Sequence, residues 1–336
     1  MQTGKVSAIA GFLPDAVLSN DVLAELYPGW DADKIYDKTG IRERRIAAEG
    51  QTAGDLAEGA ARRLFETQGI DPQSIDFLLL CTQAPDYVLP TTACIVHGRL
   101  GLRRNCGALD FNLGCSGFVY GLSLANGLIM SGAARRVLLL TADTYSKFIH
   151  PMDKSVRTLF GDGAAATLIE AEHTERPAMG PFVFGTDGAG ASNLMVPAGG
   201  ARRPRDAASA EESIDASGNV RSADNLYMNG AEILAFTLTA VPQAVAQLLD
   251  AADAGMDDFD LFVFHQANAF MLERLRRKLA IAPERFVVDM ALRGNTVSST
   301  IPLALEPLMG SGGPPREAML VGFGVGYSWA ATRLTL

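Results

Sequence analysis

An internal repeat is the sequence feature that most constrains the fold, because three segments recur in the same order, offset by about 180 residues. Each first-half segment has a second-half counterpart with a matching pattern of helix-like, turn-like and strand-like residues. The matched pairs are 60–85 with 244–268, 107–117 with 286–296, and 131–141 with 311–322. The repeat predicts two similar halves that pack as one body.

Both halves alternate apolar strand-like runs with helix-like segments, which predicts a layered α/β fold. We place the halves at residues 1–172 and 173–336. Residues 197–225 are rich in Gly, Ala, Ser and charged residues, which predicts an exposed, mobile excursion. Pro242 lies in the apolar helical pattern that follows and predicts a break or kink there.

Charge and residue usage exclude several classes of protein. The net charge of −9 and the scattered basic residues argue against a nucleic-acid partner. The N-terminal residues lack the pattern of a signal peptide, and no run reaches the roughly 18 to 20 apolar residues of a membrane span. We therefore expect a cytoplasmic protein without a membrane span. The four cysteines lack paired spacing, so we expect no metal site.

Cys115 lies between two glycines in "DFNLGCSGFVYGL", residues 110–122, where a strand-like run gives way to a helix-like one. A thiol at a helix N-terminus meets partial positive charge, and a neighbouring imidazole would also raise its thiolate fraction. Cysteine is, however, often a small buried packing residue. The residues around Cys115 alone leave both interpretations open.

The repeat, rather than the residues next to them in the sequence, makes His265 and Asn295 candidate functional residues. His265 ends an apolar run and Asn295 suits a helix N-cap, so each has an ordinary structural interpretation. If the halves pack about a pseudo-twofold axis, both residues face one cleft with Cys115 and the turn at 322–329. That turn, "GFGVGYSW", lacks the following helix and acidic residue of a dinucleotide site. For Asp162 we favour a structural hydrogen-bonding role.

Five motifs in order then resemble the beta-ketoacyl-[acyl-carrier-protein] synthase III family of the thiolase superfamily. They are "GCSGF", "FGDGA", "HQAN", "GNT" and "GFGVGYSW", joined by "KTGIRERRIA" near the N-terminus. The resemblance implies a five-layered α-β-α-β-α fold built from the two halves, a homodimer, and a catalytic set of Cys115, His265 and Asn295.

The resemblance also implies a reaction. Cys115 would take an acyl group from a thioester, with the backbone amides of Cys115 and Val325 as the oxyanion hole. His265 and Asn295 would bind the carbonyl of a malonyl thioester as it decarboxylates, and the product would be a beta-ketoacyl thioester. No cofactor is implied beyond the substrates, which are acyl-CoA or acyl-[acyl carrier protein] and a malonyl thioester.

The family's CoA-binding tryptophan and arginines are replaced here by Lys34, Lys38 and Lys154, and Trp30 is out of register. Lysine offers no planar stacking surface, so we expect a carrier-borne acyl donor rather than acyl-CoA. The predicted substrate-binding residues are Leu89, Asn268, Phe323, Lys38 and Lys154, with Leu89 crossing the dimer interface. The basic residues Arg274, Arg276, Arg277 and Lys278 form either a weak carrier-protein docking site or a solvated helix face.

Three functions fit these residues. The leading one is a decarboxylating condensing enzyme of fatty-acid or specialised lipid or polyketide biosynthesis. The second is an acyltransferase that moves the acyl group from Cys115 to an oxygen or nitrogen nucleophile without decarboxylation. The third is an inactive partner subunit.

Overall fold

The computed structural model describes residues 1–310 and 314–336, and two mixed β-sheets form its core. The first sheet has the order β1-β7-β6-β4-β5 and the second has the order β13-β14-β15-β8. The strands of the first are β1 (Gln2–Phe12), β4 (Phe77–Cys81), β5 (Gly107–Phe111), β6 (Arg136–Asp143) and β7 (Gly163–His173). Those of the second are β8 (Met179–Thr186), β13 (Leu261–Phe264), β14 (Glu317–Gly324) and β15 (Ser328–Thr335).

The second sheet repeats the topology of the first. β8, β15, β14 and β13 take the places of β1, β7, β6 and β4, with the same sequence of antiparallel, antiparallel and parallel pairings. Where β5 pairs with β4, the second half has a single parallel bridge between Phe262 and Phe286. The repeat in the sequence is therefore a repeat of sheet topology. Residues 311–313 of the third matched pair lie outside the described residues, and the boundary at residue 172 stays a prediction.

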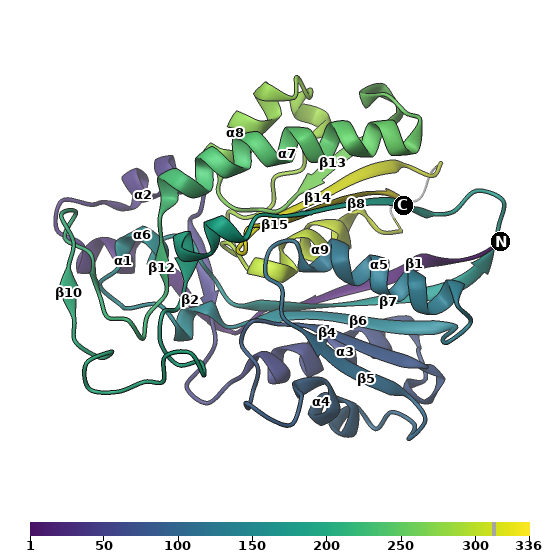
Figure 1. Cartoon of the computed structure of the whole chain (residues 1–336), viewed down its shortest axis with the longest axis horizontal. Helices are drawn as coiled ribbons and strands as arrows, with labels where there is room; N and C mark the ends of the chain where they lie inside the picture. The colour runs from purple at the N-terminus through teal and green to yellow at the C-terminus, as the bar shows by residue number, and fades with distance from the viewer. Residues whose placement is uncertain (311–313) are drawn as a thin grey trace.

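Three layers of helices enclose the sheets (Figure 1), and the predicted five-layered thiolase-like fold is confirmed. α5 (Gly117–Met130) and α9 (Thr300–Leu305) lie between the two sheets. α3 (Ala53–Gln68) and α4 (Thr92–Leu100) cover the outer face of the first sheet, and α7 (Gly230–Ala252) and α8 (Ala269–Lys278) that of the second. α5 is apolar on most of its circumference because it packs on both sheets.

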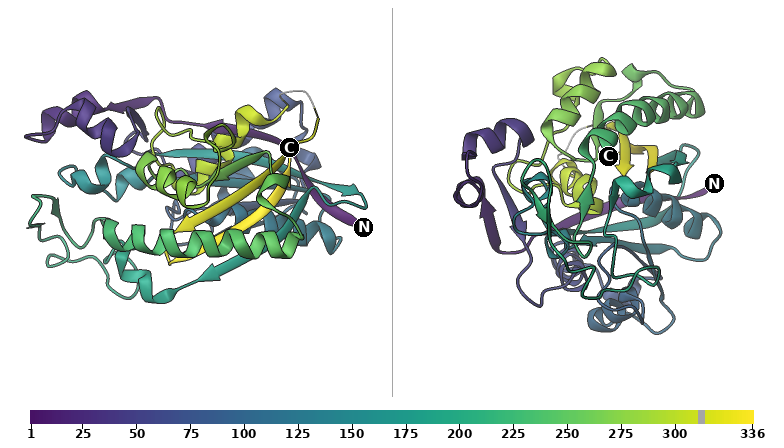
Figure 2. Two further views of the ribbon diagram at one scale, coloured as in Figure 1. Left: turned by 90° about the horizontal axis from the view of Figure 1, so that it is seen from above. Right: turned by 60° about the vertical axis from the view of Figure 1, so that its left-hand side comes forward.

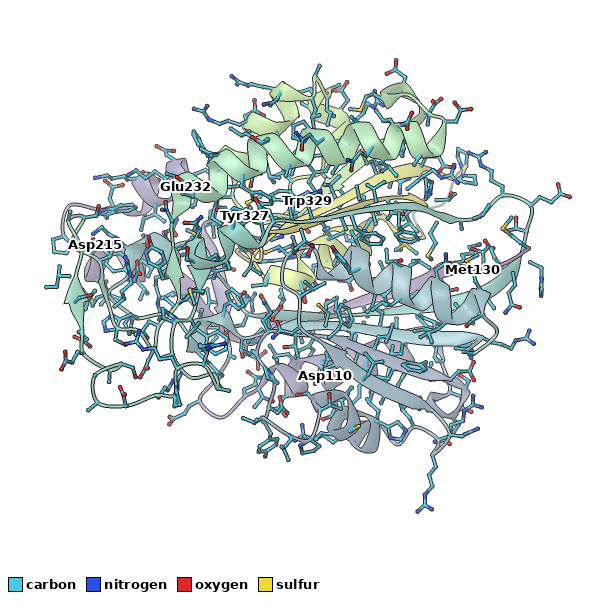
Figure 3. All side chains as sticks on the ribbon, in the orientation of Figure 1. Asp110, Met130, Asp215, Glu232, Tyr327 and Trp329 are labelled. Atoms are coloured by element: carbon cyan, nitrogen blue, oxygen red, sulfur yellow. The ribbon has the colours of Figure 1, made fainter. Side chains whose placement is uncertain are left out.

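α7 runs from Gly230 to Ala252 with Pro242 inside it, so Pro242 does not break the helix, and the alternative of a kink stays a prediction. Among the described residues, it is the one helix whose length and hydropathy would suit a membrane span. One face of α7 packs on β8, β14 and β15, as in a core helix. Phe236 of this face stacks on Tyr327 with ring centroids 4.0 Å apart, and Figure 3 shows Tyr327 and Trp329 beneath the helix.

The segment between β1 and α3 forms a small subdomain that packs beside the sheets (Figure 2). It contains the hairpin of β2 (Ala16–Ser19) and β3 (Glu43–Ile46) and the helices α1 (Asn20–Leu26) and α2 (Ala32–Thr39). The Arg44 side chain is fully buried and ties this subdomain to the body. Its guanidinium donates to Asn20 Oδ1 (2.8 Å) and to the carbonyl of Thr158 (2.7 Å). Burial lowers the pKa of Arg44 to about 10.

The excursion at 197–225 is largely exposed, and several backbone hydrogen bonds connect its turns; its mobility stays a prediction. It contains the hairpin of β10 (Ser213–Ile214) and β11 (Val220–Arg221), and the pair β9 (Leu194–Met195) and β12 (Tyr227–Met228) flanks it. Arg221 donates to Asp215 (2.7 Å) and to Asp153 (2.8 Å), the N-cap of α6 (Lys154–Arg157). These ion pairs replace the apolar contacts that the excursion lacks.

We expect Arg44→Met to destabilise the protein by about 3 kcal/mol, because the substitution leaves buried oxygens of Asn20 and Thr158 without a donor. Urea unfolding would measure the change. Arg62→Met is the matched control, since the Arg62 side chain is 51% exposed and its ion pair should contribute about 0.5 kcal/mol. Equal losses in the two variants would contradict the role assigned to Arg44.

Candidate active site

Cys115 lies in the turn between β5 and α5, and its side chain is 6% exposed. The backbone N–H groups of Cys115 and Val325 lie close to the Cys115 sulfur and favour the thiolate form. The Val325 amide reaches the sulfur because Gly324 has no side chain. A Cβ on Gly324 would lie 2.8 Å from Cys115 Sγ. The turn between β14 and β15 thus brings the Val325 amide of the second half close to the Cys115 thiol of the first half.

The Cys115 thiol is protonated at neutral pH in this structure. Burial, and then the carboxylate of Asp143, raise the pKa of Cys115 to about 12. The expectation of an increased thiolate fraction at Cys115 is therefore wrong, because burial outweighs the groups that favour the thiolate. Asp143 is itself fully buried, and burial raises its pKa to about 7. A base must therefore take the thiol proton for the sulfur to attack a substrate.

His265 follows β13 and is a neutral imidazole, because burial lowers its pKa to about 3. Its Nδ1 lies 2.7 Å from the hydroxyl of Thr300. That hydroxyl has one proton and donates it to the carbonyl of Val297 at 3.1 Å. Nδ1 therefore carries the imidazole proton and donates to Thr300, and the lone pair on Nε2 faces the Asn295 amide N–H at 3.4 Å.

Asn295 directs its amide nitrogen towards His265. Asn295 Nδ2 lies 3.4 Å from His265 Nε2, and Asn295 Oδ1 accepts from the N–H of Val297 at 2.9 Å. Its backbone is bound on both sides by the first half, to the carbonyl of Leu159 (2.9 Å) and the N–H of Gly161 (3.0 Å). The "FGDGA" turn thus positions the asparagine. Within that turn Asp162 accepts from backbone and side-chain donors, in agreement with the structural role predicted for it.

Cys115, His265 and Asn295 line one small cavity of about 80 Å³, together with Asn268 and Phe323. The ring of Phe323 packs edge-to-face on His265, with centroids 5.5 Å apart. Asn268 lines the cavity, but its Oδ1 already caps α8 by accepting from the N–H of Met271 at 2.8 Å. The rest of the lining is mostly apolar: Leu159, Phe160, Leu194, Met228, Ile233, Ala267 and Met271.

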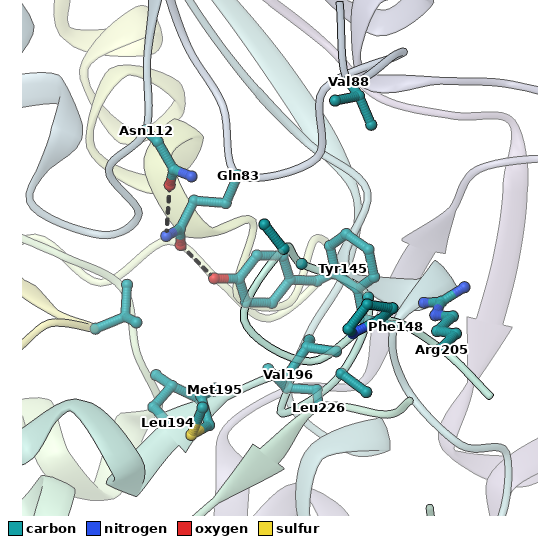
Figure 4. A pocket seen from close by; sticks show the side chains of 16 residues that line it. Gln83, Val88, Asn112, Tyr145, Phe148, Leu194, Met195, Val196, Arg205 and Leu226 are labelled. Atoms are coloured by element: carbon teal, nitrogen blue, oxygen red, sulfur yellow. Dashed lines mark hydrogen bonds between the residues drawn. The ribbon is translucent and has the colours of Figure 1, made fainter. Parts of the chain in front are cut away.

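A larger cavity of about 870 Å³ adjoins the small one, and Leu194 lines both (Figure 4). Three uncharged polar side chains form part of its wall. They are Gln83, Asn112 and Tyr145, which sequence reasoning missed, as it also missed Thr300 and Asp143. The one available signal was the polar residue Gln83, two residues after the apolar run of β4.

The other predicted substrate residues lie at the surface of the site or outside it. Leu89 is 79% exposed and lines neither cavity of its own chain. Lys38 Nζ lies 4.5 Å from the ring centroid of Trp30, so the out-of-register tryptophan is nevertheless near this lysine. Lys154 donates to the carbonyl of Ser217 at 2.5 Å. These contacts engage both ammonium groups with the chain itself.

The basic residues of α8 are partly neutralised. Arg276 and Arg277 both pair with Glu273, at 2.8 Å and 2.5 Å, and Arg274 stacks on Phe270. Arg274, Arg277 and Lys278 line a hollow together with Leu238, Phe270 and Glu273. A partner with acidic and apolar side chains would fit this hollow, and the docking role stays a prediction.

The fold and the site define the thiolase-like class of proteins, and comparisons narrow the class to one family. Residues 109–188 match the model for 3-oxoacyl-[acyl-carrier-protein (ACP)] synthase III, and 249–336 match the model for its C-terminal part. The chain therefore belongs to the beta-ketoacyl-[acyl-carrier-protein] synthase III family of acyl-condensing enzymes of fatty-acid biosynthesis.

Individual relatives agree over nearly the whole chain. A synthase III from Streptomyces coelicolor is 37% identical over 98% of this chain and 96% of its own. A crystal structure of a 3-oxoacyl-[acyl-carrier-protein] synthase III superposes with a TM-score of 0.98, at 59% identity over 99% of this chain and 100% of that one. The priming beta-ketosynthase of the R1128 polyketide pathway has a TM-score of 0.83 at 29% identity, over 99% and 96% of the two chains.

We expect Asp143→Asn to lower the pKa of the Cys115 thiol. A pH of 8 is above the Asp143 pKa of about 7, so the Asp143 carboxyl carries a negative charge at this pH. This charge disfavours the Cys115 thiolate. Removing this charge should speed the alkylation of Cys115 by about 3- to 10-fold. Peptide-resolved mass spectrometry after iodoacetamide treatment would measure the rate, with the exposed Cys94 as the internal reference. The expectation would be contradicted if Asp143→Asn unfolds at the same midpoint as wild type and the rate of Cys115 labelling is unchanged.

Proposed function

We propose that the chain loads an acyl group on Cys115 and condenses it with a malonyl thioester by decarboxylation. One observation carries the proposal. Two backbone amides converge on the Cys115 sulfur in a cavity that also holds a neutral imidazole and a side-chain amide. The amides suit the oxyanion of a thioester under attack, and the other two groups suit the enolate of a second thioester. Membership of a condensing-enzyme family supports the same assignment.

In the acylation step, His265 Nε2 removes the thiol proton as the Cys115 sulfur attacks the thioester carbonyl. A bond forms between sulfur and carbonyl carbon, and the negative charge on the oxygen meets the N–H groups of Cys115 and Val325. The intermediate collapses with cleavage of the donor carbon–sulfur bond, and the donor thiol leaves with the proton. The tautomer with the lone pair on Nε2 suits this role.

In the condensation step, Asn295 Nδ2 and a protonated His265 Nε2 donate to the carbonyl of the malonyl thioester. Carbon dioxide leaves, the enolate carbon attacks the acyl carbonyl, and the bond to the Cys115 sulfur breaks as the carbon–carbon bond forms; the departing thiolate then takes a proton from water. A neutral His265 can donate from Nε2 only if Nδ1 carries no proton. The Thr300 hydroxyl must then donate to Nδ1 instead of to Val297.

An acyl carrier protein is the proposed partner, as the names of the relatives state for their own substrates. Lys34, Lys38 and Lys154 replace the CoA-binding tryptophan and arginines of the family, which favours a carrier-borne acyl donor over acyl-CoA. We also propose a homodimer. Within the described residues no strand pairs with the outer edge of β5, and the neighbouring Tyr87, Val88 and Leu89 are exposed. A partner copy would cover both, and Leu89 would reach the larger cavity of that copy. No other cofactor is needed.

We expect His265→Ala to lower carbon dioxide release by about 100- to 1000-fold, because the enolate loses a preorganised donor. The assay supplies a carrier-borne acyl donor and radiolabelled malonyl carrier protein, and mass spectrometry follows the adduct on Cys115. Cys115→Ala, the control for that adduct, should lose it entirely. Wild-type acylation without carbon dioxide release would indicate an acyltransferase instead. Wild-type protein without any adduct would indicate an inactive partner subunit.

We expect Thr300→Val to slow decarboxylation by about 10- to 100-fold, because valine keeps the shape of threonine but removes the hydroxyl that sets the tautomer of His265. Thr300→Ser keeps the hydroxyl and should stay within a few-fold of wild type. Carbon dioxide release, with adduct formation on Cys115 measured separately, would test both variants. Equal rates in the serine and valine variants would exclude the hydroxyl from this role.

A further inference from the structure

We infer that the larger cavity holds the acyl chain and that its polar wall selects chains carrying a neutral hydrogen-bonding group, such as a hydroxyl or a ketone, over plain alkyl chains. The wall consists of Gln83, Asn112 and Tyr145, and is called the polar wall below. The inference rests on the proposed loading of Cys115 and adds the class of acyl group to it.

The two cavities share one lining residue, and the larger one reaches the residue whose backbone amide faces the nucleophile. Leu194 lines both, and Val325 lines the larger one while its N–H lies close to the Cys115 sulfur. The small cavity of about 80 Å³ has room for only two or three water-sized groups, at roughly 30 Å³ each. The larger cavity, of about 870 Å³, is the adjoining space for the rest of a longer chain.

The polar wall contacts Gly114, the residue that precedes Cys115 in the sequence. A Cβ on Gly114 would lie 2.5 Å from Gln83 Oε1, so the amide of Gln83 occupies the space left free by this glycine. A chain bonded to the neighbouring Cys115 therefore passes close to Gln83 within its first few carbon atoms.

The polar wall has unused hydrogen-bonding capacity. Tyr145 donates its hydroxyl to Gln83 Oε1 (2.5 Å), and Gln83 Nε2 donates to Asn112 Oδ1 (3.0 Å), as Figure 4 shows. Within residues 1–310 and 314–336, no other hydrogen bond engages the Tyr145 oxygen or the second Nε2 proton of Gln83. A substrate hydroxyl can accept from Gln83 and donate to Tyr145, whereas a ketone can accept from Gln83.

The charge of the cavity lining further restricts which polar group the acyl chain can carry. All three residues of the polar wall are uncharged, and Arg205, also in the lining, has Asp224 at 3.9 Å. A neutral group fits this wall better than a carboxylate. The remaining lining is largely apolar and suits methylene groups: Phe148, Leu194, Met195, Val196 and Leu226. An alkyl chain would cover the polar wall without satisfying it, which is the basis of discrimination.

Acyl loading from matched thioesters tests the inference. Octanoyl carrier protein is compared with the five carrier proteins bearing octanoyl chains hydroxylated at carbons 3 to 7, and the rate of adduct formation on Cys115 is measured by mass spectrometry. At least one hydroxylated chain should load about 10-fold or more faster than octanoyl. Equal or faster loading of octanoyl than of all five would overturn the inference. Absence of any adduct would instead overturn the proposed function on which it rests.

Two variants connect the preference to the polar wall. Tyr145→Phe, which removes only the hydroxyl, and Gln83→Leu should each reduce the hydroxyl preference to about 3-fold or less. Tyr120→Phe removes a phenolic hydroxyl from α5 outside both cavities and should retain the full preference. A preference that persists in both polar-wall variants would show that another part of the chain selects the acyl group, and would overturn the assignment.

Discussion

The approach of the β14–β15 turn to the start of α5 is the contact on which the site depends. A Cβ on Gly322 would lie 2.7 Å from Ser116 Cα, and one on Gly324 would lie 2.8 Å from the Cys115 sulfur. Ser116 and Ser328, whose hydroxyls are 2.7 Å apart, close the same contact. Because the backbones meet here without intervening side chains, an amide from one half lies close to the nucleophile of the other.

The same close packing sets the protonation states of the site. Burial raises the pKa of Cys115 to about 12 and lowers that of His265 to about 3, so both groups are neutral across the physiological range. An ion pair of thiolate and imidazolium, as in many cysteine enzymes, is therefore disfavoured here before substrate binds. Deprotonation of the thiol is instead coupled to its attack on the thioester, whose developing oxyanion finds two donors already in place.

The repeat in the sequence predicted the sheet topology and the convergence of Cys115, His265 and Asn295, because topology follows from the order of strands and helices. Side-chain contacts between distant segments have no such periodic signal. Thr300 lies 35 residues from His265, and Tyr145 lies 62 from Gln83, so neither pair was predictable. The contact of Arg221 in the excursion with Asp153 is likewise one that composition does not reveal.

Gly114 and Val325 connect the chemistry of the site to the shape of the larger cavity. A Cβ on Gly114 would lie 2.8 Å from Val325 Cγ1 and 2.5 Å from Gln83 Oε1, so the glycine admits both side chains. Val325 places a branched side chain in this space, and the missing side chain at 114 supplies the room it needs. The backbone that presents Cys115 is thus also the surface on which Val325 and Gln83 pack. Any change at residue 114 would therefore alter the oxyanion amide and the polar wall together.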